Sequence, residues 1–163
     1  MIRLLEPDDA EELAALYRAN RAFLAPFEPD RADEFYTTAH QRRRIERIGR
    51  DLWRWAILDG DEMVGMIALV DVVREEVQLG NVGYFVAKEH NGQGHATSAV
   101  ADVVAFAFGE AGLHRMEAGT LVDNFASQRV LEKNGFERFG LAKRYLLIAG
   151  EWRDHVLFER NAD

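Results

Sequence analysis

Apolar and polar residues follow one another in a pattern that predicts two helices near the N-terminus. After a short apolar run, Pro7 opens an acidic segment whose apolar positions keep helical spacing over residues 8–24. Proline suits a first helical turn because its missing N–H would have no partner there. A second, strongly charged helix is predicted over residues 33–50. Its inward-facing residues are expected to be Phe35, Ile45 and Ile48.

The pattern changes after this point to apolar runs of strand length. Residues 52–58 and 62–70 flank Asp59–Gly60, a dipeptide that favours a tight hairpin turn. Six further elements are predicted in order: a strand at 77–87, a helix at 95–109, a strand at 114–122, a helix at 124–134 and two strands around Gly150. This order predicts a single α/β domain over residues 1–163, with an α+β mixed sheet. Its first half is antiparallel, and a strand–helix–strand crossover follows.

Composition narrows the chemistry. The chain has 163 residues and no cysteine, which excludes a disulfide scaffold, a thiolate zinc site and a cysteine nucleophile. Its net charge of −8 argues against a general nucleic-acid binder and allows a cationic partner. The longest stretch without a charged residue, 90–101, is too short to span a membrane. We therefore expect a cytoplasmic protein, either a monomer or a homodimer.

A glycine-punctuated loop carries the strongest chemical signal. The strand at 77–87 leads into Asn91–Gly92–Gln93–Gly94–His95–Ala96, and a helix follows directly. Glycines let a ligand approach the backbone, and the amides at a helix start attract anions. The loop therefore suits a pyrophosphate, although a plain strand-to-helix turn has about equal weight. It is neither a Walker loop nor a GxGxxG dinucleotide fingerprint.

A second element opens the helix at 124–134. Asn124 is a natural N-cap, which places Ser127 at about the third helical position. Each residue alone is more often structural than catalytic. Metal chemistry has less support: the five histidines, at 40, 90, 95, 114 and 155, show no metal-ligand spacing, so no metal is expected.

Together these elements resemble the GNAT superfamily of N-acetyltransferases, in particular the group of the ribosomal-protein N-terminal acetyltransferases RimJ and RimL. The resemblance covers nearly the whole chain and includes NRAFLAPFEP (20–29), GYFVAKEHNGQGHATSAV (83–100), GLHRMEAGTLVDNFASQRVLEKNGFERFG (112–140) and GEWRDHVLFE (150–159). The family loop reads Arg/Gln-x-x-Gly-x-Gly/Ala, and this chain departs from it only at Asn91. The departure matters little if backbone amides hold the phosphates.

The resemblance implies the GNAT fold and acetyl transfer from acetyl-CoA to an amine. The backbone of Phe85, Val86 and Ala87 would pair with the pantetheine arm, and the segment from Asn91 to Thr97 would cradle the pyrophosphate. The Val86 N–H would stabilise the developing oxyanion. Two residues of the helix start remain: the Asn124 side chain would contact the pantetheine, and Ser127 would donate a hydrogen bond to the departing thiolate.

The acceptor and its base are less defined. Because the chain has no thiol, direct attack by the amine in a ternary complex is favoured over an acyl-enzyme. Many relatives have a glutamate where this chain has Asn81, which leaves Glu28 as the best local candidate, with Glu75 and Glu76 behind it. For each of these three, a solvated surface acid is the more frequent role. Phe27 and Tyr84 are expected near the acceptor, and Tyr145 could replace Ser127 as the acid.

Three functions remain open at this point. A protein N-terminal α-amine is the expected acceptor, a small amine such as a polyamine, an aminoglycoside or an amino-acid-like toxin is the alternative, and a non-catalytic acyl-CoA-binding module is the third. The Arg42–Arg44 cluster could meet RNA or the CoA 3′-phosphate, but a solvated helix face is several times more frequent. We expect Asp154, in the closing motif, to be structural.

Overall fold

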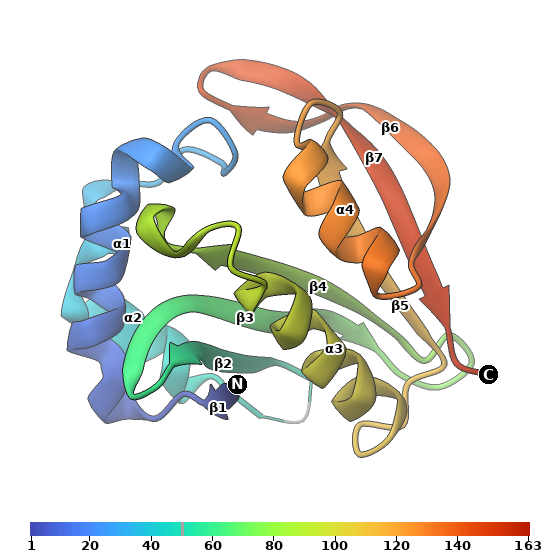
Figure 1. Cartoon of the computed structure of the whole chain (residues 1–163), viewed down its shortest axis with the longest axis horizontal. Helices are drawn as coiled ribbons and strands as arrows, with labels where there is room; N and C mark the ends of the chain where they lie inside the picture. Colours follow the sequence, from blue (N-terminus) through green and yellow to red (C-terminus); the bar gives the residue numbers. More distant parts are fainter. Residues whose placement is uncertain (50) are drawn as a thin grey trace.

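The computed structural model describes residues 1–49 and 51–163. Its strands form one sheet in the order β1-β2-β3-β4-β5-β7-β6, with helices on both faces (Figure 1). The helices are α1 (Ala10–Leu24), α2 (Thr38–Glu46), α3 (His95–Phe108) and α4 (Phe125–Lys133). The strands are β1 (Ile2–Leu4), β2 (Trp53–Asp59), β3 (Glu62–Val73), β4 (Leu79–Val86), β5 (Arg115–Leu121), β6 (Glu137–Ile148) and β7 (Glu151–Asn161).

The predicted division of the sheet is confirmed. Strands β1 to β4 pair antiparallel in sequence order, and the Asp59–Glu62 pair closes the predicted hairpin between β2 and β3. The chain then crosses over through α3, so that β5 lies parallel to β4. The two last strands pair antiparallel with each other, and β7 also pairs with β5.

Both faces of the central strands are covered, which explains why β3 reads as an almost continuous apolar run. One face packs against α3 and α4 and includes Ile67, Leu69 and Val86. The opposite face, which includes Met66 and Phe85, packs against α1 and α2. Successive residues of β4 therefore belong to different cores, and this fixes the register of the strand at the site.

The single helix predicted over residues 33–50 is wrong in its bounds. The chain forms a 3-10 turn at Asp33–Tyr36, and Thr37 then takes an extended conformation with φ of −90° and ψ of 149°. Its hydroxyl accepts a hydrogen bond from the His40 N–H and caps α2, which ends at Glu46. Threonine favours such caps over helix interiors because its hydroxyl competes for backbone N–H groups. The predicted end at residue 50 lies outside the described residues.

The inward face of this segment is largely as predicted. Phe35 and Ile45 are buried, and Ile48 is half-buried against the same core. None of the helices in the described ranges is long and apolar enough to cross a membrane.

Candidate active site

The central feature of the site is a seam in the sheet between β4 and β5. These strands pair only from Leu79 to Asn81 on one side and from Arg115 to Glu117 on the other. Beyond this contact β4 runs toward α1 while β5 runs beneath α4 (Figure 1). The seam opens into a cleft of about 600 Å³ lined by both strands, which also reaches α1, α2 and the start of α3.

The amide of Val86 faces this seam. The Ala87 N–H donates to the Val64 carbonyl of β3 at 2.8 Å. Amide directions alternate along a strand, so the preceding N–H, that of Val86, points away from β3 and into the cleft. Gly65 of β3, opposite Val86, lets the backbones of β3 and β4 lie close together here, because a Cβ at this position would lie 2.3 Å from the Phe85 carbonyl oxygen.

The glycine-punctuated loop has the backbone conformation that its residues require. Gly92 and Gly94 have φ of 77° and 90°, in the left-handed region that glycine tolerates. The first hydrogen bond of α3 runs from the Ser98 N–H to the Gly94 carbonyl. The amides of His95, Ala96 and Thr97 therefore have no partner within the helix and can bind an anion. The positive end of the helix dipole adds to the attraction.

The Asn91 side chain has a structural contact that sequence reasoning missed. Its Nδ2 donates to the carbonyls of Val86 and Ala87, at 3.0 and 2.9 Å. It thereby ties the loop to the end of β4. The buried Asn20 of α1 reinforces this junction, because its Oδ1 accepts a hydrogen bond from the Lys88 N–H at 2.9 Å.

Ser127 and Tyr84 meet across the seam. The Tyr84 hydroxyl lies 2.9 Å from Ser127 Oγ and 3.2 Å from the Ser127 carbonyl oxygen. Burial raises the pKa of Tyr84 to about 12, against the opposing hydrogen bond to Ser127. The predicted cap is confirmed: Asn124 Oδ1 accepts from the Ser127 N–H at 3.2 Å. The Asn124 side chain thus fixes the position of Ser127.

The far end of the cleft, which we call the acceptor end, is formed by α1, the loop after it and α2. Phe27 and Glu28 line it with Arg31 and Arg44. Glu28 is half-buried, and burial raises the pKa of its carboxyl, while Arg31 and Arg44 partly oppose the rise. Arg44 was expected on a solvated helix face, and this is wrong. Its guanidinium lies over the Phe35 ring, 4.8 Å from the ring centroid.

Other predicted candidates lie elsewhere. Tyr145 is 52% exposed, packs against the His155 ring and is not among the described residues that line the cleft. Glu75 and Glu76 are exposed in the turn between β3 and β4. Asp154 has the expected structural contact, since its carboxylate accepts a hydrogen bond from the Arg144 N–H at 2.7 Å.

Two polar residues of the cleft were not anticipated as site residues. Thr120 of β5 is buried, and its hydroxyl has no hydrogen-bond partner among the described residues. His155 of β7 is also buried, with Nδ1 3.2 Å from the Arg153 carbonyl oxygen. The alternation of residues along each strand predicts that both side chains are buried. They line the cleft because β5 separates from β4 beyond residue 117.

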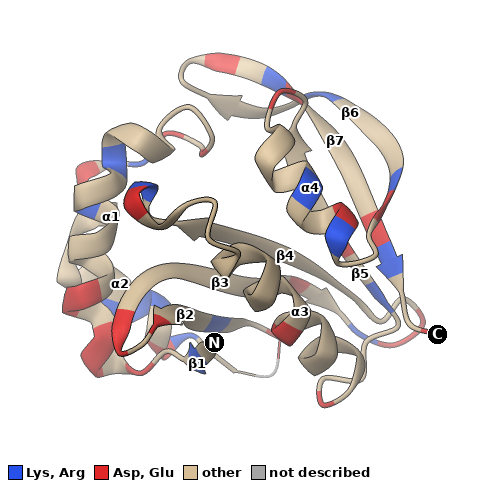
Figure 2. Cartoon of the chain, in the orientation of Figure 1, with Lys and Arg blue, Asp and Glu red and all other residues tan. Residues whose placement is uncertain are grey.

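The charge of the cleft differs from that of the whole chain. Glu28 is the only carboxylate among the described lining residues, whereas the basic ones include Arg31, Arg44, Arg129 and Lys133. Figure 2 marks Lys and Arg positions in blue on α4. An acidic protein thus presents a basic cleft, which suits a polyanionic ligand.

These features agree with the comparisons. The family described as "Acetyltransferase (GNAT) domain" matches residues 1–137. The chain belongs to this family and is an acetyltransferase whose cosubstrate is acetyl-CoA. The open seam and the free amides at the start of α3 fit that cosubstrate: the strand edge can pair with the amide-containing pantetheine arm, and the amides can hold its pyrophosphate.

Three similar proteins give the family context. The chain is 42% identical to the probable N-acetyltransferase YjcK of Bacillus subtilis, over 99% of this chain and 94% of the relative. The crystal structure of a ribosomal-protein-S5-alanine acetyltransferase from Vibrio fischeri superposes with a TM-score of 0.96 and 30% identity, covering 99% and 92% of the two chains. Mycobacterium smegmatis RimJ, solved in complex with CoA-disulfide, superposes with a TM-score of 0.92 and 28% identity, covering 99% of this chain and 81% of RimJ.

Proposed function

We propose that this acetyltransferase acts on the α-amine of a protein N-terminus. The observation that carries the proposal is the charge at the acceptor end, where one carboxylate, Glu28, lies within electrostatic reach of Arg31 and Arg44. A polyamine carries several positive charges, which the two arginines would repel and the single carboxylate could not balance. A peptide N-terminus brings one amine, and its backbone carbonyls can accept hydrogen bonds from the guanidinium groups. The similarity to an S5-alanine acetyltransferase supports the same class.

The energetics of the amine also favour this acceptor. The attacking nitrogen must be neutral, and an α-amine with a pKa of about 8 loses its proton at pH 7 for about 1–1.5 kcal/mol. A lysine side chain, with a pKa of about 10.4, would need about 4.6 kcal/mol. One weakly basic carboxylate is enough for the first task. Glu28, whose pKa is raised by burial, is suited to take that proton.

The remaining roles follow from the positions of the residues. Backbone groups of Phe85, Val86 and Ala87 would hold the pantetheine arm, and the Val86 N–H would stabilise negative charge on the carbonyl oxygen. As the amine nitrogen bonds to the carbonyl carbon and its proton passes to Glu28, the carbon–sulfur bond would break and CoA would leave as a thiolate, to whose sulfur Ser127 would donate a hydrogen bond. Tyr84, hydrogen-bonded to Ser127, would orient that hydroxyl.

The anionic part of the cosubstrate would meet the start of α3. Amides from Asn91 to Thr97 would hold the pyrophosphate, and Arg129 and Lys133 of α4 would add positive charge at the rim of the cleft. The Asn124 side chain, which caps α4, would lie beside the pantetheine.

A matched set of acceptors tests the proposal. Peptides with a free N-terminal alanine, the same peptides acetylated at the N-terminus but retaining an internal lysine, and spermidine would each be incubated with acetyl-CoA. Release of CoA is read with a thiol reagent, and the enzyme contributes no background because it has no cysteine. Turnover is expected only with free N-termini. Faster turnover of spermidine, or equal turnover of the blocked peptides, would overturn the proposal.

A further inference from the structure

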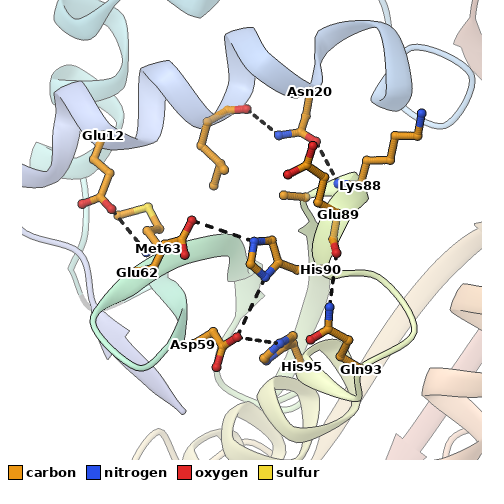
Figure 3. A network of polar contacts seen from close by, with 12 residues as sticks. Glu12, Asn20, Asp59, Glu62, Met63, Lys88, Glu89, His90, Gln93 and His95 are labelled. Atoms are coloured by element: carbon orange, nitrogen blue, oxygen red, sulfur yellow. Dashed lines mark hydrogen bonds and ion pairs between the residues drawn. The ribbon is translucent and has the colours of Figure 1, made fainter.

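A cluster of two imidazoles and one carboxylate lies beside the glycine-punctuated loop and has no role in the acetyl transfer described above. Its members come from three separate places: Asp59 ends β2, His90 ends the 3-10 turn Lys88–His90, and His95 begins α3. Figure 3 shows the three side chains converging from the hairpin turn and from both ends of the loop. One ligand atom from each lies within 4.8 Å of the other two.

The individual contacts are longer than hydrogen bonds. Asp59 Oδ2 lies 3.9 Å from His90 Nδ1 and 3.7 Å from His95 Nε2. Both ring nitrogens are buried, and neither has a hydrogen-bond partner among the described residues. Buried polar atoms are normally paired, so two lone ring nitrogens aimed at one carboxylate point to a missing common partner.

A second carboxylate stands behind the cluster. Glu62 Oε1 lies 3.8 Å from His90 Nε2, on the side of the ring opposite Asp59 (Figure 3). A carboxylate near Nε2 favours the tautomer in which Nε2 keeps its proton and Nδ1 carries the lone pair. Histidine ligands of metals typically have a carboxylate on this side of the ring as the partner of the second nitrogen, and Glu62 occupies that place, although at 3.8 Å it is farther than a hydrogen bond.

We propose that Asp59, His90 and His95 form a binding site for a divalent transition-metal ion, of which Zn²⁺ fits best. Two imidazole nitrogens and one carboxylate oxygen are ligands that Zn²⁺ prefers, with water in a fourth position. Bonds of about 2.1 Å in a tetrahedron separate the ligand atoms by about 3.4 Å. Closing the observed contacts of 3.7 and 3.9 Å to that value takes shifts of a few tenths of an ångström.

The position of the ion has a structural effect. His90 and His95 bracket the segment 91–94, so one ion bonded to both holds the two ends of the glycine-punctuated loop. Asp59 at the same time anchors this loop to the β2–β3 turn. The ion takes no part in the transfer chemistry, and the site is independent of the acceptor proposed above.

Titration of the tag-free, EDTA-treated protein with Zn²⁺ tests the site. Calorimetry is expected to show one ion bound per chain, and Co²⁺ in place of Zn²⁺ is expected to give the visible absorption of a four- or five-coordinate ion. Asp59→Asn and His90→Gln should each weaken the affinity at least about tenfold. Thermal unfolding with and without Zn²⁺ checks that each variant folds, because parent and variants should melt alike without the metal.

Matched controls separate this site from incidental binding. Asp61→Asn removes an exposed carboxylate from the same turn, and His114→Gln removes an exposed imidazole elsewhere. Both should bind Zn²⁺ as the parent does. Binding that survives Asp59→Asn, or that is lost equally in the controls, or the absence of one-to-one binding up to about millimolar Zn²⁺, would overturn the proposal.

Discussion

The Tyr84 hydroxyl lies 2.9 Å from Ser127 Oγ. A residue of β4 and a residue of α4 are therefore hydrogen-bonded across the seam where the cosubstrate is expected. The pKa of about 12 at Tyr84 keeps this hydroxyl protonated throughout the pH range of an assay. When Tyr84 donates to Ser127 Oγ, the serine proton is free to point elsewhere. The pair can therefore pass a hydrogen bond toward the sulfur without either residue becoming charged beforehand.

The first prediction concerns the serine. Ser127→Ala is expected to lower kcat by about 10-fold to 100-fold, because the leaving thiolate loses its hydrogen-bond donor. The dissociation constant of acetyl-CoA, measured by calorimetry, should change little because the backbone contacts remain. Unchanged kcat in the variant would remove Ser127 from the mechanism.

The second prediction tests whether Tyr84 acts through Ser127. Tyr84→Phe should lower kcat by less than Ser127→Ala does, since it removes the orienting hydroxyl and leaves the donor. In the double variant the tyrosine change should have almost no further effect, because the two act as a unit. Additive losses in this double-mutant cycle would show that Tyr84 acts independently.

The third prediction uses the pH profile of Glu28. In the parent, log(kcat/KM) should rise by one per pH unit below the pKa of the peptide amine. The slope should steepen to two below the pKa of Glu28, which burial places above the ordinary 4.5. In Glu28→Gln the slope should stay at one and the rate should fall. An identical profile in parent and variant would exclude Glu28 as the base.

The raised pKa of Glu28 also affects stability: a rise in pH is expected to increase the rate but to lower the free energy of unfolding. Between pH 4.5 and the higher pKa of the folded state, the folded protein binds more protons at Glu28 than the unfolded chain. The free energy of unfolding therefore falls as pH rises through this window and stays lower above it. Glu28→Gln cannot lose stability in this way. Its Tm relative to the parent should therefore increase between pH 4 and pH 7, as read by differential scanning calorimetry.

The fifth prediction separates backbone strain from ligand binding. Gly94 and Gly150 have φ of 90° and 78°, and a Cβ at either would meet no heavy atom within 4 Å. Alanine at each position should therefore destabilise the fold similarly, by about 1–3 kcal/mol in chemical denaturation. Only Gly94→Ala should also weaken acetyl-CoA binding, by about tenfold, because only Gly94 opens α3. Equal affinities in the two variants would contradict a role of the loop in binding.

Local patterns in the sequence were sufficient for much of the fold. The Asp59–Gly60 turn, the apolar run of β3 and the cap at Asn124 each depend on neighbours within a few residues, and the structure has all three. The resemblance to acetyltransferases added the family. The break at Thr37 was missed because the flanking residues have helical spacing, while a threonine cap leaves little trace in that spacing.

The place of Arg44 at the acceptor end and the histidine cluster could not be predicted in the same way, although Phe27 and Glu28 were expected near the acceptor. Arg44 reaches the cleft only because α2 packs beside α1, and its neighbours in sequence suggest a solvated helix face. Asp59 and His95 are 36 positions apart in the chain, so their contact depends on how the hairpin turn meets the start of α3. Spacing along the chain carries no record of such contacts.

The partial pairing of β4 and β5 has a consequence for the free protein. Backbone groups from Val82 to Val86 face a strand edge that the chain itself leaves open beyond Asn81. Binding that fills this edge should slow hydrogen exchange there far more than elsewhere, so that the cosubstrate acts as a removable strand. The enzyme then gains rigidity when it is loaded and gives it up with each release of product.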